Sequence, residues 1–174
     1  MRLVTPADLE GLQAVHADEE VTAFLPYGPW HEPADAAAWY ARVEAQAESA
    51  WFFVLVDRAS DHIIGLAQLF RLDVGAARVE LGYVLGRAWW GQGYMTEALR
   101  GLIGLAFGAL GLRRIEAEIH PDHQRSIRVM QRLGFREEGR RRERWVRQGI
   151  PYDVLCYGLL VHEAGDFGSN PFAR

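Results

Sequence analysis

The sequence lacks several features that mark particular classes of protein. It has a single cysteine, Cys156, so no disulfide can form within the chain, and this fits a reducing cytoplasm. We interpret this thiol, which lies in an apolar strand, as a buried packing group and not a nucleophile. No stretch approaches the run of about eighteen uncharged apolar residues that a membrane helix needs. Residues 1–8 also lack the apolar core of a secretion signal. We therefore expect a cytoplasmic protein without a membrane partner.

An excess of basic charge is also missing. The formal net charge is −4 and the pI is about 5.9. Because phosphates are neutralised by clustered basic groups, this balance argues against a nucleic-acid partner. The basic run Arg140–Arg144 is interrupted by Glu143, and we interpret it as the solvated edge of a hairpin. His120 and His123 have no clear carboxylate or cysteine partner, so we predict no metal site.

At 174 residues the chain is long enough for one domain with its own core. We predict this domain over residues 1–163, followed by a loose polar tail over residues 164–174. Hydrophobic periodicity, caps and turn residues predict an alternating order of helices and strands. The expected elements are strands at 2–4, 51–56, 63–70, 78–85, 114–119, 140–147 and 152–160, and helices from Thr5 and at 33–48, 96–110 and 124–133.

One glycine turn is the most informative part of the sequence. The apolar run 79–85 (VELGYVL) stops at Gly86, and Gly91 and Gly93 then frame one residue just before a helix-forming stretch. Glycine has no Cβ, so the backbone can turn tightly and come close to a ligand. The first amides of a helix have no internal partners and lie at its positive end. The pattern indicates a site for a phosphate or pyrophosphate.

Three classes of protein use such a turn. An ATPase-type phosphate loop requires Lys and then Ser or Thr after its last glycine, but Tyr94 and Met95 follow Gly93. A dinucleotide fingerprint requires a third glycine where Thr96 stands, although Glu116 lies at about the distance of its acidic residue. The turn therefore argues against a dinucleotide-binding protein but does not exclude one.

The third class is the acetyl-CoA loop of the GCN5-related N-acetyltransferases (GNAT), with the pattern Gln/Arg-x-x-Gly-x-Gly/Ala. Residues Trp90–Met95 occupy its six positions, with Gly93 as the strict match, and the local pattern Trp-Gly-x-Gly-Tyr-x-x-Glu-Ala resembles the RimJ/RimL-like branch that acetylates N-termini of ribosomal proteins. Residues 120–135 (HPDHQRSIRVMQRLGF) resemble the second motif of the family and keep its spacing. Residues 149–155 resemble the last hairpin of that branch.

The resemblance covers roughly residues 2–160 and implies the acyl-CoA N-acyltransferase fold. This is an α/β (α+β) fold whose mixed central sheet of about six or seven strands is flanked by about four helices. The implied activity is an acetyl-CoA-dependent N-acetyltransferase in which a primary amine attacks the thioester directly in a ternary complex. A protein N-terminus is the favoured acceptor, while a small-molecule amine and a homodimer stay open. Because the family's Asn and Tyr are replaced by His123 and Met130, a non-catalytic acyl-CoA sensor is the alternative.

The resemblance also implies which residues hold acetyl-CoA. In the family the pyrophosphate lies on the amides of the turn, and the pantetheine arm lies along the preceding strand. The implied contacts are Trp90, Gly91, Gln92, Gly93, Tyr94 and Met95 for the phosphates, and Tyr83, Val84 and Leu85 for the arm. His123 is either a contact of the pantetheine amides or a helix cap.

Acetyl transfer needs a base, because a free alkylamine with a pKa of about 10 is mostly protonated at neutral pH. Glu80 is the candidate, since it is a charged residue in an apolar strand and shares a face with Gly82 and Val84 by alternation. Family members often place a glutamate there, acting directly or through water. The alternative is a structural ion pair with Arg78 or Arg114.

The departing thiolate needs a proton or a hydrogen bond. Met130 stands where the family has its tyrosine and cannot donate, but Ser126 lies four residues earlier on the same helical face. A serine there is thought to contact the sulfur in the ribosomal branch, and the alternative is a serine that satisfies the helix start. Loops carry specificity, so we expect segments 24–30 and 148–152 to border the acceptor.

Overall fold

The computed structural model describes residues 1–165. Its strands are β1 (Arg2–Leu3), β2 (Trp51–Val56), β3 (Ile63–Asp73), β4 (Arg78–Leu85), β5 (Arg114–Ile119), β6 (Arg136–Arg147) and β7 (Ile150–Leu160). Its α-helices are α1 (Leu9–His16), α2 (Glu19–Thr22), α3 (Pro33–Ala45), α4 (Tyr94–Phe107) and α5 (Gln124–Arg132), and two 3-10 helices are η1 (Pro6–Asp8) and η2 (Arg87–Trp89). The strand order is β1-β2-β3-β4-β5-β7-β6. Because β4 and β5 are parallel whereas β5 and β7 are antiparallel, the sheet is mixed, as expected.

Most predicted elements are present, and their ends differ for local reasons. The predicted first helix begins as η1, the short α2 was not predicted, and β6 begins four residues earlier than expected, at Arg136. Helix α4 ends at Phe107 and not at Leu110. The chain turns there into Gly111, whose φ of 61° lies in the left-handed region, and the Leu112 amide bonds to the Ala106 carbonyl.

The described chain divides into two compact units. The first contains Met1–Arg71 and Gly82–Tyr94, and the second contains Leu72–Leu81 and the chain from Met95 onward. The predicted single domain over residues 1–163 stays a prediction. Most of the predicted loose tail, residues 166–174, lies outside the described residues.

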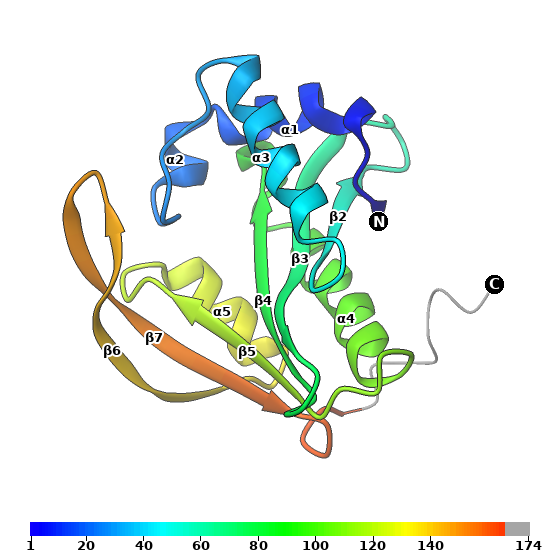
Figure 1. Ribbon diagram of the computed structural model, residues 1–174, viewed down its shortest axis with the longest axis vertical. Coiled ribbons are helices and arrows are strands. Elements are labelled where there is room, and N and C mark those ends of the chain that lie inside the picture. Colours follow the sequence, from blue (N-terminus) through cyan, green and yellow to red (C-terminus); the bar gives the residue numbers. More distant parts are fainter. Residues whose placement is uncertain (166–174) are drawn as a thin grey trace. The chain divides into compact units, whose positions relative to one another are not determined.

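The first unit has an aromatic core. Helices α1, α2 and α3 lie next to one another (Figure 1), and their apolar faces join β2 and β3 in one buried cluster. Trp30 stacks on the His16 ring at 3.9 Å between centroids and lies 5.6 Å from Trp39. Trp30 is only 5% exposed, so this end of segment 24–30 belongs to the core.

The second unit contains a long β6–β7 hairpin, with β5 running beside β7 (Figure 1). One face of β5 is apolar, with Ile115, Ala117 and Ile119 all buried. Alternation places Arg114, Glu116 and Glu118 on the other face. The sheet of this unit therefore has a polar face on which charged side chains gather.

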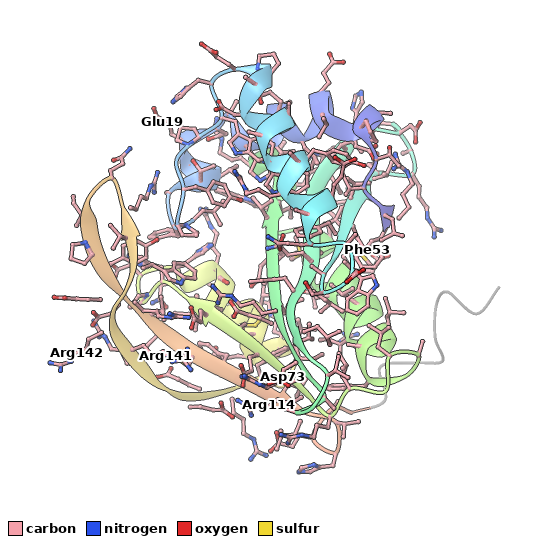
Figure 2. All side chains as sticks on the ribbon, in the orientation of Figure 1. Glu19, Phe53, Asp73, Arg114, Arg141 and Arg142 are labelled. Carbon is pink, nitrogen blue, oxygen red and sulfur yellow. The ribbon has the colours of Figure 1, made fainter. Side chains whose placement is uncertain are left out.

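A chain of ion pairs crosses this polar face. Arg78 bonds both Asp73 at 3.2 Å and Glu116 at 3.0 Å. Arg114 bonds Glu116 at 2.8 Å and pairs with Glu138, whose pKa is lowered chiefly by this hydrogen bond. Figure 2 labels Asp73 and Arg114, which belong to this network. The network fixes the strand ends of the second unit.

Candidate active site

The glycine turn lies in the first unit and is anchored from both sides. The Gly86 amide bonds to the Ile64 carbonyl at 2.8 Å, which continues the pairing of β4 with β3. The Trp90 indole donates to the Leu85 carbonyl at 2.7 Å, and its ring packs against the core of this unit. The Trp90 amide donates to the Arg87 carbonyl at 3.1 Å. Trp90 therefore holds the turn in place.

The backbone of the turn has the conformation that the sequence predicts. Gly91 and Gly93 have φ values of 76° and 90°, a range that residues other than glycine rarely adopt. Apart from the glycine itself and its two chain neighbours, no atom of residues 1–165 lies within 4 Å of the point that a Cβ on either glycine would occupy. Helix α4 begins directly afterwards at Tyr94. The turn thus presents bare backbone to open space at a helix start, which fits the pyrophosphate of acetyl-CoA.

The side chains around the turn leave this space clear. Gln92 folds back, and its side-chain amide bonds to the Ala88 carbonyl at 2.8 Å. The Tyr94 ring packs edge-on against Trp89 at 5.4 Å. Met95, which replaces the family's small residue, is buried. On β4, Val84 and Leu85 are buried and Tyr83 is half-buried.

Glu80 lies in the second unit, half-buried on β4. It is the register partner of Glu116 on the parallel strand β5. Arg78 and Arg114 both have carboxylate partners other than Glu80. Glu80 also acts electrostatically on Arg144, whose pKa is raised chiefly by Glu118 and further by Glu80. Glu80 therefore sits among charged groups on the polar face.

Helix α5, also in the second unit, carries His123 and Ser126. His123 is the N-cap residue, without a side-chain capping bond. Burial, with smaller contributions from Arg125 and His120, lowers its pKa to about 4, so the ring is neutral at pH 7. Ser126 is 5% exposed and Met130 is fully buried. The predicted common helix face of these two side chains is therefore turned into the protein.

Sequence reasoning missed a second group of polar residues, centred on Glu118. Its side chain is 5% exposed and accepts hydrogen bonds from Arg141 at 2.6 Å, Arg144 at 3.1 Å and the Trp145 indole at 2.9 Å. The alternation in residues 114–119 (RIEAEI) indicates a polar face. Nothing in the sequence indicates which donors meet it.

The basic run is an exposed strand edge, as predicted, since residues 140–144 are all exposed on the outermost strand β6. Three arginines of this run nevertheless form ion pairs with carboxylates of the protein itself. Arg140 pairs with Asp153 at 2.6 Å, while Arg141 and Arg144 pair with Glu118. In Figure 2, Arg141 and Arg142 mark this part of the hairpin. Cys156 is half-buried, and burial raises the pKa of its thiol, which disfavours the nucleophilic thiolate.

Residues 1–165 lack two further kinds of feature. No helix in that range is long and apolar enough to cross a membrane. No group of three or more His, Cys, Asp and Glu side chains within it is arranged to hold a metal ion.

Known proteins share both the sequence and the fold. The family model for the acetyltransferase (GNAT) domain matches residues 1–136. The uncharacterized N-acetyltransferase p20 of Bacillus licheniformis is 31% identical over 168 residues, which cover 94% of this chain and 93% of p20. The [ribosomal protein uS5]-alanine N-acetyltransferase of Escherichia coli is 34% identical over 122 residues, covering 64% of this chain and 63% of that enzyme.

Solved structures agree with this result. A GCN5-related N-acetyltransferase from Brucella melitensis has a TM-score of 0.81 and 27% identity, covering 93% of this chain and 75% of that one. The spermidine N-acetyltransferase of Vibrio cholerae, solved with CoA and spermine, also has a TM-score of 0.81, but at 18% identity it shows the fold alone. The choice that the glycine turn left open is thereby decided against the dinucleotide-binding class. The chain belongs to the GNAT family and is an N-acetyltransferase.

Proposed function

We propose that this protein transfers the acetyl group of acetyl-CoA to the N-terminal amine of a peptide or protein, by direct attack in a ternary complex. The observation that carries the proposal is the turn at Gly91 and Gly93, with positive φ at both glycines, open space beside them and a helix start at Tyr94. Backbone amides in this arrangement suit a pyrophosphate whatever side chains surround them. The single cysteine supports a cytoplasmic location.

Three side chains are assigned roles in this proposal. Glu80 takes the proton from the attacking amine, directly or through water. Ser126 gives a hydrogen bond to the sulfur as the thiolate leaves. His123, neutral at pH 7, contacts the pantetheine amides. Bound acetyl-CoA supplies the activated acyl group, and no enzyme thiol or metal is required for direct transfer.

The preference for a peptide acceptor has one line of support in the relatives. The Escherichia coli relative named above is, by its name, an alanine N-acetyltransferase that acts on the ribosomal protein uS5. The Vibrio cholerae neighbour acts on spermidine, but its low identity gives no reason to transfer that substrate. A polyamine is therefore the second candidate acceptor.

The test is release of CoA thiol from acetyl-CoA with three acceptors. These are an octapeptide with a free N-terminal alanine, the same octapeptide already acetylated at its N-terminus, and spermidine. We expect turnover with the free octapeptide and none with the blocked one. This chain contains no lysine, so self-acetylation of an amine is confined to its own N-terminus and is readily measured by mass. Tight binding of acetyl-CoA without turnover on any acceptor would favour the sensor alternative.

A further inference from the structure

One buried polar atom in the second unit has no function assigned so far. Within the described residues, the hydroxyl oxygen of Tyr152 on β7 is buried and has no hydrogen-bond partner. Burial raises the pKa of this phenol, which keeps the proton on the oxygen at neutral pH. An unsatisfied buried hydroxyl costs stability and is uncommon in folded proteins. Its retention is explained if a ligand supplies the missing partner.

The Tyr152 ring is held in a defined position. It lies 4.9 Å from the His120 ring and 5.8 Å from the Trp145 ring, which meets it edge-on. Trp145 is fixed in turn, because its indole donates to Glu118, the buried carboxylate that also binds Arg141 and Arg144. The hydroxyl is therefore attached to a rigid support.

A bulge in β6 creates this arrangement. Arg141 pairs with Val154 and Trp145 pairs with Tyr152, so three residues of β6 lie opposite Asp153 alone. Asp153 holds the bulge, because it accepts from the Glu143 amide at 2.8 Å and from Arg140 at 2.6 Å. Bulges re-aim side chains and are common beside active sites. Here the bulge brings Arg144 and Trp145 together onto Glu118.

Strand register places Tyr152 on the same sheet face as Glu80. Glu80 is the partner of Glu116, and Glu118 is the partner of Cys156. Alternation along β7 then puts Tyr152 on the face of Cys156. Gly158 on β7 is the partner of Glu116, and Tyr152 lies six residues from Gly158 along the same strand. Six residues of strand correspond to roughly 20 Å. A ligand that reaches both side chains must be extended, and a peptide of up to about six residues spans this length.

The charges near Tyr152 select the kind of group that can bind there. Arg147 shares the face of Trp145 on β6 and acts electrostatically on the Tyr152 hydroxyl. The His120 ring also lies beside Tyr152, and Glu118, which accepts from the Trp145 indole, is paired with two arginines. A cation beside the hydroxyl disfavours a second ammonium group of a polyamine. It favours an electron-rich oxygen such as a peptide carbonyl.

We propose that the Tyr152 hydroxyl donates a hydrogen bond to a backbone carbonyl of an extended peptide acceptor, downstream of the amine that is acetylated. Tyr152 is then a specificity-determining residue, and Trp145 and Glu118 are positioning residues. The assignment rests on the proposed peptide N-acetyltransferase activity. It explains why a hydroxyl is kept in a buried position without an internal partner.

The test is Tyr152→Phe, which removes only the hydroxyl. With the free octapeptide as acceptor we expect KM to rise about tenfold, the effect of one hydrogen bond of ordinary strength. KM for acetyl-CoA and for a dipeptide of the first two residues should stay the same, because neither reaches Tyr152. The Tm should stay the same or rise, since an unsatisfied polar group is removed.

Tyr157→Phe is the matched control on the same strand. Tyr157 is also buried, but its hydroxyl donates to Glu137 at 3.1 Å. This variant should lower Tm and leave KM for the octapeptide unchanged. An unchanged octapeptide KM in Tyr152→Phe overturns the proposal, and so does an equal loss with the dipeptide.

Failure of the proposed activity is separable from failure of this assignment. If the wild type turns over no acceptor, octapeptide binding is measured by calorimetry in the presence of CoA. Binding that is weakened about tenfold in Tyr152→Phe supports the site even without turnover. A wild type that does not bind the octapeptide, or that binds spermidine more tightly, overturns it.

Discussion

The two units hold their candidate functional groups by different physical means. In the first unit the glycine turn offers backbone, and its shape depends on two residues with positive φ. In the second unit the polar face offers side chains, and its shape depends on ion pairs that join strands distant in sequence. A site built from backbone should tolerate changes of neighbouring side chains, because its groups do not depend on side-chain identity. A side-chain site tolerates few, because each donor in it has a particular acceptor.

This difference predicts how each site responds to mutation. Acetyl-CoA binding at the turn should be lost only when the backbone conformation or the open space beside it is lost. Activity that depends on the polar face should decrease stepwise, as single hydrogen bonds or charges are removed. The variants below test this contrast.

Gly93→Val should have the largest effect. Valine is strongly disfavoured at a φ of 90°, and its side chain would fill the open space beside the turn. Wild-type protein should be stabilised by about 2.7 kcal/mol at a hundredfold excess of acetyl-CoA over its Kd. The variant should lose this stabilisation, as measured by thermal melting.

Gly75→Val is the control for that experiment. Gly75 is exposed in a turn, its φ lies outside the left-handed region, and a Cβ there would meet only Asp73 at 3.6 Å. Acetyl-CoA should stabilise this variant as it does the wild type. Retained stabilisation in Gly93→Val would show that the turn is not the phosphate site.

The free energy of unfolding should fall in acid because of a buried histidine in the first unit. His16 is fully buried, and desolvation lowers its pKa to about 4 from an ordinary 6.5. Between pH 4 and 6.5 the imidazole of His16 is protonated in the unfolded chain but neutral in the folded chain. The stability that comes from keeping His16 neutral is therefore fully present above pH 6.5. It is lost as the pH falls to 4, which lowers the free energy of unfolding by at most about 3 kcal/mol.

The measurement is the free energy of unfolding in urea between pH 4 and 7. His16→Phe keeps an aromatic ring against Trp30 but cannot titrate, so its stability should fall less steeply with acid. His62→Asn, at an exposed histidine, serves as the control and should follow the wild-type curve. Parallel curves for wild type and His16→Phe would mean that other groups cause the acid sensitivity.

Glu80→Gln tests the polar face directly. The amide keeps the shape of the side chain and removes its basicity, so kcat/KM should fall about 10²-fold or more near neutral pH. Affinity for acetyl-CoA should not change. Glu116→Gln, at the register partner that already binds Arg78 and Arg114, should reduce activity far less. Near-normal turnover of Glu80→Gln would assign the base to another group or to water.

The contrast between the units also explains what could be predicted from the sequence. Strands β2, β4 and β5 match the expected bounds, because each is a short apolar or alternating run between turn residues. The glycine turn was predictable because positive φ restricts the choice of residue. Local chemical rules therefore sufficed to predict the conformation of this turn.

The side-chain site depends on contacts that no local rule specifies. Trp145 reaches Glu118 across 27 positions of sequence, and only the bulge opposite Asp153 brings it there. From the sequence, Arg78 or Arg114 was a possible ion-pair partner of Glu80, and the structure pairs these two arginines with Asp73, Glu116 and Glu138. Register and bulges decide such pairings, and they follow from the whole sheet.

Ser126→Ala should reduce turnover less than Glu80→Gln does. Ser126 is buried on α5, and Met130, which replaces the family's tyrosine, cannot donate a proton. A serine hydroxyl is a poor acid, so its contribution to the departing thiolate is a hydrogen bond and not full proton transfer. Loss of one such bond to a charged group, roughly 1.5–3 kcal/mol, should lower kcat about 10- to 100-fold.

The affinity for acetyl-CoA separates the two possible roles of Ser126. The thioester is neutral before attack, so a hydrogen bond that matters only to the thiolate should leave acetyl-CoA binding nearly unchanged. Equal losses in binding and in kcat would make Ser126 a residue that positions the cofactor. If neither changes, the serine only satisfies the start of α5, and the leaving thiolate is stabilised by other groups of the polar face or of the turn.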